Sequence, residues 1–387
     1  MDLRNLPSEL DADGRVAKRR TLIERELHVQ LDALAIRPEQ IGAADERNCE
    51  QMFGAVPIPV GLAGPLHIHF SSGESAETYL PLVTTEAALV ASINRGCKAI
   101  TAAGGVRTSS EYVGITRSIA FEVKDAEGIA GEIRRLEPAW KKAAEATSGH
   151  LKVLSYEIDA KEDVLFLTIA ADTDEAMGMN MLTIAAQSVG EFLAKELGIP
   201  MLTVAGNVDS DKKPSVRTKT KGRGYRVRAE AVISENVVQE VLKSNPEALL
   251  KTARAKLELG SELADTLGKN LHVANAIVAL YLATGQDAAH VVEGSLADTI
   301  LTKQEDGIRM RVEFPALLVG VRGGGTQLPA QKQCLDLILK NKTKLRPAAQ
   351  LAETIAAAAL AGELSLLAAQ STNTLAGAHR NLARGNQ

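Results

Sequence analysis

Residues 151 to 171 read Leu151-Lys-Val-Leu-Ser-Tyr-Glu-Ile-Asp-Ala-Lys-Glu-Asp-Val-Leu-Phe-Leu-Thr-Ile-Ala-Ala171, and this stretch decides the fold of the chain. Leu151 to Ile158 and Val164 to Ala171 are rich in apolar and β-branched residues, which predicts two strands. The polar stretch Asp159 to Asp163 between them predicts a connecting turn. We therefore expect two adjacent strands at this point.

The residues on either side extend this strand pair into a larger unit. Val113 to Val123 predicts a preceding strand, and Ala126 to Thr147 predicts an amphipathic helix after it. On the other side, Met177 to Leu197 predicts a second helix and Met201 to Val204 a last strand. The order β-α-β-β-α-β is that of a ferredoxin-like unit, in which two helices cover one face of an antiparallel sheet.

The rest of the chain is predicted to form one larger domain that this unit interrupts, so the expected fold class is α+β. Arg15 to Leu34 has apolar residues at helical spacing, and the segment 47 to 66 is too rich in proline for a helix interior or a central strand. Ala-rich Leu351 to Leu367 predicts a buried helix. The expected organisation is a small helical segment over 1–45, a large domain over 46–110 and 206–387, and the ferredoxin-like domain over 111–205.

The composition excludes several classes of protein. The 387 residues are 45% hydrophobic and 24% charged with a net charge of -4, so we expect no nucleic-acid partner. The three cysteines have no C-x-x-C spacing, and we predict neither a disulfide framework nor a metal site. The chain shows no signal peptide and no run of 18 apolar residues, so we expect a cytoplasmic protein without a membrane partner.

The turn Asp209-Ser-Asp-Lys-Lys-Pro214 sets lysines beside carboxylates, which is a suitable place for an ammonium group to meet a developing oxyanion. Glu86 and Asp287 each lie just ahead of an apolar helical stretch, where a carboxylate also stabilises a helix N-terminus. If both converge on Lys212, repulsion and burial would raise one pKa and leave Glu86 able to donate a proton. The sequence leaves both interpretations open.

The string Asp174-Glu-Ala-Met-Gly-Met-Asn-Met181 lies between a predicted strand and a predicted helix. Backbone N–H groups at such a helix start bind phosphate, and Gly178 allows close approach. No G-x-G-x-x-G occurs in a βαβ context, so a Rossmann domain is not predicted. Near the C-terminus, His379 lies in a helical region, where a lone histidine more often interacts with the helix dipole.

Together these strings, with Leu82-Val-Thr-Thr-Glu-Ala-Ala-Leu-Val90, Ala283-Thr-Gly-Gln-Asp-Ala-Ala289 and Gly323-Gly-Gly-Thr326, resemble the motifs of 3-hydroxy-3-methylglutaryl-CoA (HMG-CoA) reductases. The resemblance covers about residues 46 to 384 and is closer to the biosynthetic class I enzymes, in a form without a membrane anchor. It implies two NADPH-dependent hydride transfers that convert HMG-CoA to mevalonate and coenzyme A.

The resemblance also implies roles for particular residues. The large domain would bind substrate, and the ferredoxin-like domain would bind the dinucleotide. The implied catalytic residues are Glu86, Lys212, Asp287 and His379; the cofactor-binding residues are Ser148, His150, Lys152, Asp174, Glu175, Met177, Gly178, Met179, Asn180 and Arg384; the substrate-binding residues are Glu50, Arg117, Asn207, Asp211, Lys213, Lys256, His272 and Asn275.

The chain departs from the family pattern at four positions: Gln51, Gly149, Glu175 and Ala205. Gly149 stands where animal enzymes have an arginine for the 2′-phosphate of NADPH, although His150 and Lys152 lie close by. We expect NADPH, with NADH as the less favoured cofactor.

Besides the biosynthetic reductase, two other functions are considered from the sequence, and its oligomeric state is left open. The protein is expected to be a homodimer with a shared active site, or a tetramer built from two dimers. The same fold could instead run oxidatively with NAD to degrade mevalonate. A silent protein that binds CoA thioesters or nucleotides is disfavoured, because a pure binder has no need of all four catalytic residues.

Overall fold

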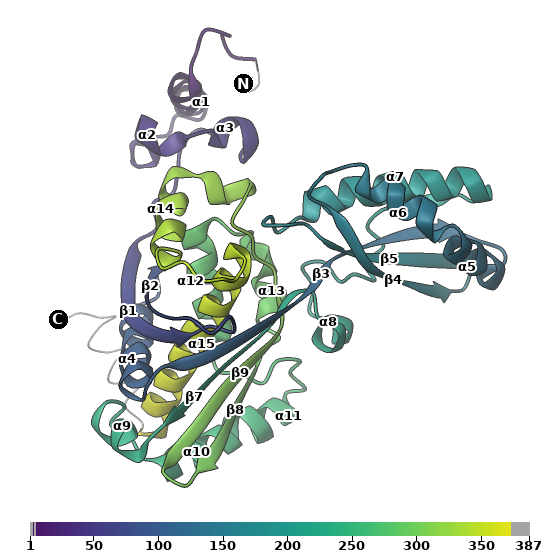
Figure 1. The fold of residues 1–387 in the computed structure, drawn as a ribbon. Helices are drawn as coiled ribbons and strands as arrows, with labels where there is room; N and C mark the ends of the chain where they lie inside the picture. Colours follow the sequence, from purple (N-terminus) through teal and green to yellow (C-terminus); the bar gives the residue numbers. More distant parts are fainter. Residues whose placement is uncertain (1–2, 4, 373–387) are drawn as a thin grey trace.

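The computed structural model describes residues 3 and 5 to 372, and its framework consists of two sheets that share one long strand (Figure 1). The strands are β1 (Val60–His69), β2 (Ser75–Val83), β3 (Val106–Glu122), β4 (Lys152–Lys161), β5 (Val164–Asp172), β6 (Met201–Thr203), β7 (Gly224–Ile233), β8 (Asp298–Gln304) and β9 (Gly307–Leu317). The larger sheet has the order β2-β1-β3-β7-β9-β8. The smaller sheet pairs β3 with β5 and β6, and β5 with β4.

Helices cover both sheets. The α-helices are α1 (Ala12–Leu27), α2 (Pro38–Ile41), α3 (Ala44–Arg47), α4 (Leu89–Ala102), α5 (Ala126–Arg135), α6 (Glu137–Glu145), α7 (Met179–Leu197), α8 (Val216–Lys221), α9 (Glu235–Glu240), α10 (Pro246–Ala253), α11 (Ser261–Leu263), α12 (Val273–Thr284), α13 (Val291–Gly294), α14 (Pro329–Ile338) and α15 (Pro347–Ser371). The short 3-10 turns are η1 (Asp32–Leu34), η3 (Ala288–His290) and η4 (Gly324–Gln327), and η2 (Arg254–Gly260) is a π-helical turn.

The smaller sheet confirms the expected α+β class and the ferredoxin-like order. Its strands lie in the order β6-β3-β5-β4, and every neighbouring pair is antiparallel. One expectation was wrong: the single helix over 126 to 147 is two helices, α5 and α6. The break falls at Leu136, just ahead of Pro138 in the first turn of α6, because proline has no N–H with which to continue the preceding helix.

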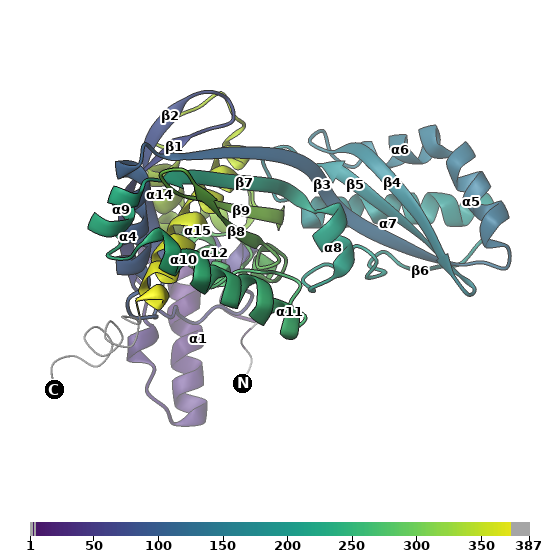
Figure 2. The same cartoon turned by 90° about the horizontal axis from the view of Figure 1, so that it is seen from below.

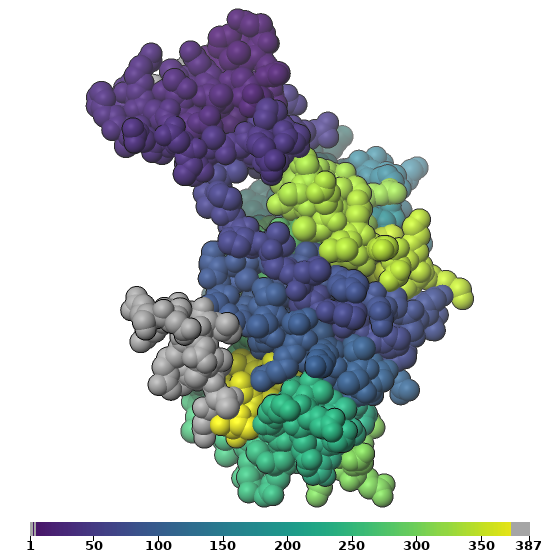
Figure 3. Space-filling model, turned by 90° about the vertical axis from the view of Figure 1, so that its left-hand side faces the viewer, coloured from purple at the N-terminus to yellow at the C-terminus, as the bar shows by residue number. Residues whose placement is uncertain are grey.

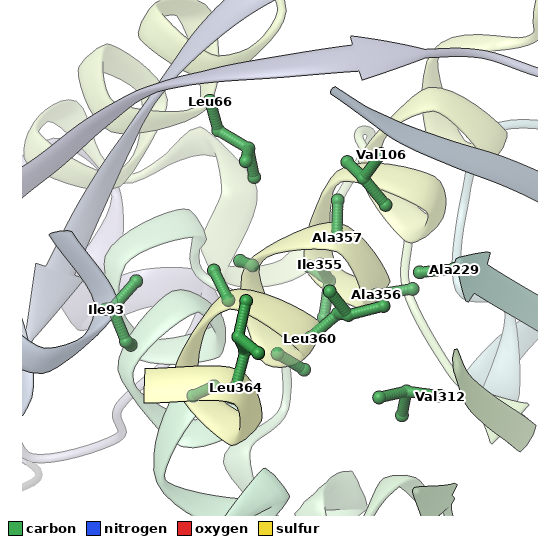
Figure 4. Close-up of a cluster of buried hydrophobic side chains, with 14 of the residues drawn as sticks. Leu66, Ile93, Val106, Ala229, Val312, Ile355, Ala356, Ala357, Leu360 and Leu364 are labelled. Atoms are coloured by element: carbon green, nitrogen blue, oxygen red, sulfur yellow. The ribbon is translucent and has the colours of Figure 1, made fainter. Parts of the chain in front are cut away.

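The core of the larger half is built around α15, which confirms the predicted buried helix. Figure 4 shows Ile355, Leu360 and Leu364 of α15 among apolar side chains of the surrounding elements. Small residues let the helices approach closely, and a Cβ at Gly96 of α4 would collide with the carbonyl oxygen of Ala361. By length and composition α15 could cross a membrane, but 94% of its apolar window is buried inside the protein, as in a core helix.

The N-terminal segment forms a separate lobe, drawn in purple in Figure 3. This lobe has its own small core of Val16, Ile41, Ala44 and Met52. The helix expected over 15 to 34 ends at Leu27, because His28 adopts a left-handed conformation. The proline-rich segment is extended, as expected, but its last residues belong to β1. Pro65 fits there because the pairing with β2 is irregular between Ala63 and Leu66.

Strand β3 carries the chain from the larger half into the smaller one, and α8 lies at their junction (Figure 2). Arg217 and Lys221 of α8 form ion pairs with Glu157 of β4. The exact domain boundaries stay a prediction.

Candidate active site

The lysine turn, residues 207 to 214, connects β6 to α8 at the junction of the two halves. Its backbone is left-handed at Asn207, Ser210 and Lys212, with φ values of 63°, 56° and 58°. The N–H of Lys212 donates to Glu293 Oε1 over 2.7 Å, and its Nζ lies 2.7 Å from Asp287 Oδ2. The turn therefore holds a half-exposed ammonium group against a carboxylate from a distant segment.

Asp287 both caps the start of a helical turn and pairs with Lys212. It precedes η3 and accepts a hydrogen bond from the N–H of Ala289 over 3.0 Å, while also pairing with Lys212. Burial raises the pKa of the Asp287 carboxyl, but the hydrogen bonds from Lys212 and Ala289 outweigh burial and hold this pKa below its ordinary value. Asp287 therefore favours its ionised form beside the ammonium group.

Arg117 of β3 brings a guanidinium group to the lysine turn. Its Nε and Nη2 donate to Thr183 Oγ1 of α7 over 3.1 and 3.0 Å. Its Nη1 lies 3.4 Å from Asp209 Oδ2 and 3.6 Å from Asp211 Oδ2. Burial raises the pKa of Asp209 against the opposing charges of Arg223 and Arg117. Arg117 could thus turn from these acids to a substrate carboxylate.

Beneath the turn lies a buried group that sequence reasoning missed. Arg223 is 1% exposed, and its Nη1 donates to Asp211 Oδ1 and to Glu293 Oε1, each over 2.8 Å. The residues around Arg223 are themselves charged, Lys219-Thr-Lys-Gly-Arg-Gly-Tyr-Arg-Val-Arg228, so its burial leaves no local signal in the sequence. Atoms of Asp211, His290 and Glu293 lie within 4.8 Å of one another, as metal ligands would. The guanidinium group of Arg223 already supplies a cation between two of these acids.

Several of the expected cofactor residues lie around the start of α7. Gly178 has a φ of 91°, and a side chain there would collide with Thr173, so only glycine fits this close turn. A cavity of about 250 Å³ nearby is lined by Gly149, His150, Leu151, Lys152, Asp172, Asp174 and Arg346. His150 Nδ1 lies 3.1 Å from Asp174 Oδ2. Arg346, which the sequence did not point to, adds a third basic side chain to this cavity, beside His150 and Lys152.

Other residues expected to bind the cofactor make contacts with neighbouring protein groups in this structure. The Glu175 carboxylate accepts from the N–H of Ala348 over 2.8 Å and from Arg346 Nε over 3.3 Å, so it anchors the start of α15. Met179 is buried with its sulfur 2.9 Å from Arg223 Nη2. Ser148 Oγ accepts from the N–H of His150 over 3.2 Å. Met177 is partly buried, and Asn180 is exposed at the helix start.

Several expected residues are not joined to the lysine turn within the part of the chain that the structure describes. Glu86 is exposed between β2 and α4, and its carboxylate makes no ion pair with Lys212 there, so their convergence stays a prediction. The backbone N–H of His272 donates to Glu363, and its ring lies near Gly362. All of the site-residue assignments stay predictions. Lys213 Nζ donates to the carbonyl oxygen of Asp211, and the N–H of Asn275 donates to the carbonyl oxygen of His272. Lys256 on η2 and Glu50 are exposed, and His379 and Arg384 lie outside the described residues.

The comparisons with known proteins agree with one another. The family model described as hydroxymethylglutaryl-coenzyme A reductase matches residues 15–384. The 3-hydroxy-3-methylglutaryl-coenzyme A reductase of Haloferax volcanii is 40% identical over 99% of this chain and 96% of its own length. That of Methanocaldococcus jannaschii is 40% identical over 95% and 92%. The NADPH-bound class II enzyme of Streptococcus pneumoniae shares the fold with a TM-score of 0.71 at 20% identity, over 91% of this chain and 96% of that one.

Proposed function

Since this chain belongs to the hydroxymethylglutaryl-coenzyme A reductase family, we propose that it is a cytoplasmic NADPH-dependent enzyme that makes mevalonate. It is an oxidoreductase that acts on HMG-CoA, and the proposal concerns its cofactor, its residues and its assembly. Reduction of the thioester takes two hydrides and two protons and yields an alcohol and the thiol of coenzyme A.

The observation that carries the proposal is the 2.7 Å contact between Lys212 Nζ and Asp287 Oδ2 at the junction of the two halves. An ammonium group held here can donate to the oxyanion that forms on the thioester carbonyl. Asp287 holds the amine in place, and Arg117 nearby offers a two-pronged donor for the far carboxylate of HMG. Glu86 would give the oxygen its proton, and His379 would give the departing thiolate its proton.

The cofactor proposal rests on the cavity at the start of α7. NADPH supplies the hydride when bound. The N–H groups at the start of α7 would hold its phosphates, because a helix N-terminus attracts anions. Lys152, His150 and Arg346 line the cavity beside this helix and can supply positive charge for a 2′-phosphate in place of the missing arginine at Gly149.

The assembly proposal is a homodimer in which each site takes Glu86 from the second subunit. An apolar surface borders Glu86 along the proline-rich segment and β1, where Val56, Val60 and Leu62 are 74%, 58% and 55% exposed. Exposed apolar residues that gather in this way are typical of an interaction surface. A two-fold dimer over this surface would cover these side chains. Two such dimers could form a tetramer.

Side-by-side assays of both nicotinamides and both directions test the proposal. Purified protein is expected to oxidise NADPH only when HMG-CoA is present, with mevalonate as the product identified by mass spectrometry. NADH is expected to support a slower reaction. If mevalonate and CoA reduce NAD faster than HMG-CoA oxidises NADPH, the degradative alternative is favoured. Binding of HMG-CoA without any turnover would favour the silent binder.

A further inference from the structure

The buried group beneath the lysine turn has a feature that the reaction described above does not use. Glu293 is fully buried, and one of its oxygens, Oε1, lies within hydrogen-bonding distance of three nitrogen atoms. These are the N–H of Lys212 at 2.7 Å, Arg223 Nη1 at 2.8 Å and His290 Nδ1 at 3.3 Å. Glu293 therefore fixes the catalytic turn and an imidazole ring at the same time.

His290 is fully buried, and its second nitrogen, Nε2, has no hydrogen-bond partner among the described residues. This nitrogen lies 3.7 Å from Asp287 Oδ2, the same oxygen that faces Lys212. A neutral imidazole has one N–H, whereas a protonated imidazole donates from both nitrogens. With a carboxylate on each side, the ring can satisfy both only in its protonated form.

The charges around the ring lead to the same conclusion. His290 faces Asp287 from its own turn and Glu293 from α13, and its charge acts on Asp211 of the lysine turn. Lys212 and Arg223 pair with these same acids, and the charges of Glu293 and Asp287 act on Tyr281 of α12. Ion pairs join four acids, Asp209, Asp211, Asp287 and Glu293, to three permanent cations, Arg117, Lys212 and Arg223. A proton on His290 supplies the fourth positive charge in this partly buried cluster, and an unpaired charge is costly at its buried members Glu293 and Arg223.

We propose that protonated His290, held by Glu293, is a positioning residue that keeps Asp287 ionised and turned toward Lys212. The inference rests on the proposed reductase function, because it assigns the purpose of this charge to the oxyanion step. It also gives the reaction a pH dependence: loss of the proton from His290 at higher pH removes one cation beside Asp287 and loosens the geometry of the lysine. The turnover number is then expected to fall as the pH rises.

The first test compares His290→Gln with His69→Gln. Glutamine keeps a donor for Glu293 but carries no charge, and His69 is a control histidine that bonds Ser75 and Gly104 instead. His290→Gln is expected to lower kcat about tenfold near neutral pH, change KM less than about twofold, and remove the fall of kcat with rising pH. The His69→Gln protein should retain the wild-type profile. Retention of the wild-type kcat and pH profile by folded His290→Gln protein would overturn the inference.

The second test needs no turnover, so it separates this inference from the reductase proposal. The protein is labelled at its histidines, and the NMR signal of His290 is identified as the one missing from the spectrum of His290→Gln. If that variant does not fold, His290→Asn serves for the same assignment. Its pH titration is expected to change in Asp287→Asn but not in Asp336→Asn, an exposed control on α14. An identical titration in wild type and Asp287→Asn would overturn the proposed charge relation, whatever the protein reduces.

Discussion

Lys212 Nζ lies 2.7 Å from Asp287 Oδ2, and the backbone of the same lysine is fixed by the buried carboxylate of Glu293. Lys212 is thus held at two points: its side-chain ammonium group pairs with Asp287, and its backbone N–H donates to Glu293. Asp287 lies just ahead of η3, and the lysine turn follows β6, so packing of the two halves brings the pair together.

This contact predicts how stability depends on pH. The pKa of Asp287 is lowered in the folded protein, so the pair contributes stability above the unfolded pKa of about 3.9. That contribution is lost as the pH falls through the folded pKa. The free energy of unfolding should therefore be lower in Asp287→Asn than in wild type at pH 6, and the difference should shrink below about pH 4. Urea denaturation checks this, with Asp336→Asn as the control; a difference that is constant down to pH 2 contradicts it.

Lys152 is predicted to contribute to the choice of nicotinamide. Lys152 lines the cavity together with Arg346, and a lysine binds phosphate as a point charge, so Lys152→Ala should lower the NADPH to NADH ratio of kcat/KM by roughly tenfold, about 1.4 kcal/mol. Lys161→Ala, an exposed change at the other end of β4, serves as the control. An unchanged ratio in Lys152→Ala, or a wild-type preference for NADH, argues against the cofactor proposal.

A shared active site predicts recovery of activity when two inactive proteins are mixed. In Glu86→Gln and Lys212→Ala subunits exchanged at equal amounts, half of the dimers are mixed and each has one intact site. About a quarter of wild-type activity should therefore return, because a two-fold dimer has two equivalent sites. Light scattering should find dimers throughout. If the mixture is no more active than its parents although mixed dimers have formed, each site lies within one chain.

The sequence predicted the smaller half well because its strands carry strong local patterns. The apolar and β-branched residues of β4 and β5, with a polar turn between them, can be recognised without any tertiary contact. The break at Leu136 was missed because the apolar spacing continues through α5 and α6, and only Pro138 marks the new start.

The residues of the active site were harder to predict from the sequence than the strands. Lys212 and Asp287 were paired through a family resemblance, since no spacing relates them. Arg223 and Glu293 were missed because each looks like an ordinary surface charge until the fold buries them against each other. Buried ion pairs between distant segments leave no local pattern in the sequence.

The most direct test of the account is the turnover of Lys212→Ala with HMG-CoA and NADPH. Removing the donor that stabilises the oxyanion should lower kcat by roughly 10²–10³-fold or more, while circular dichroism and the thermal midpoint show a folded protein. Lys332→Ala, which breaks an exposed ion pair on α14, should keep wild-type turnover. A folded Lys212→Ala protein that retains more than about a tenth of wild-type turnover would contradict the assignment of the lysine turn as the active site.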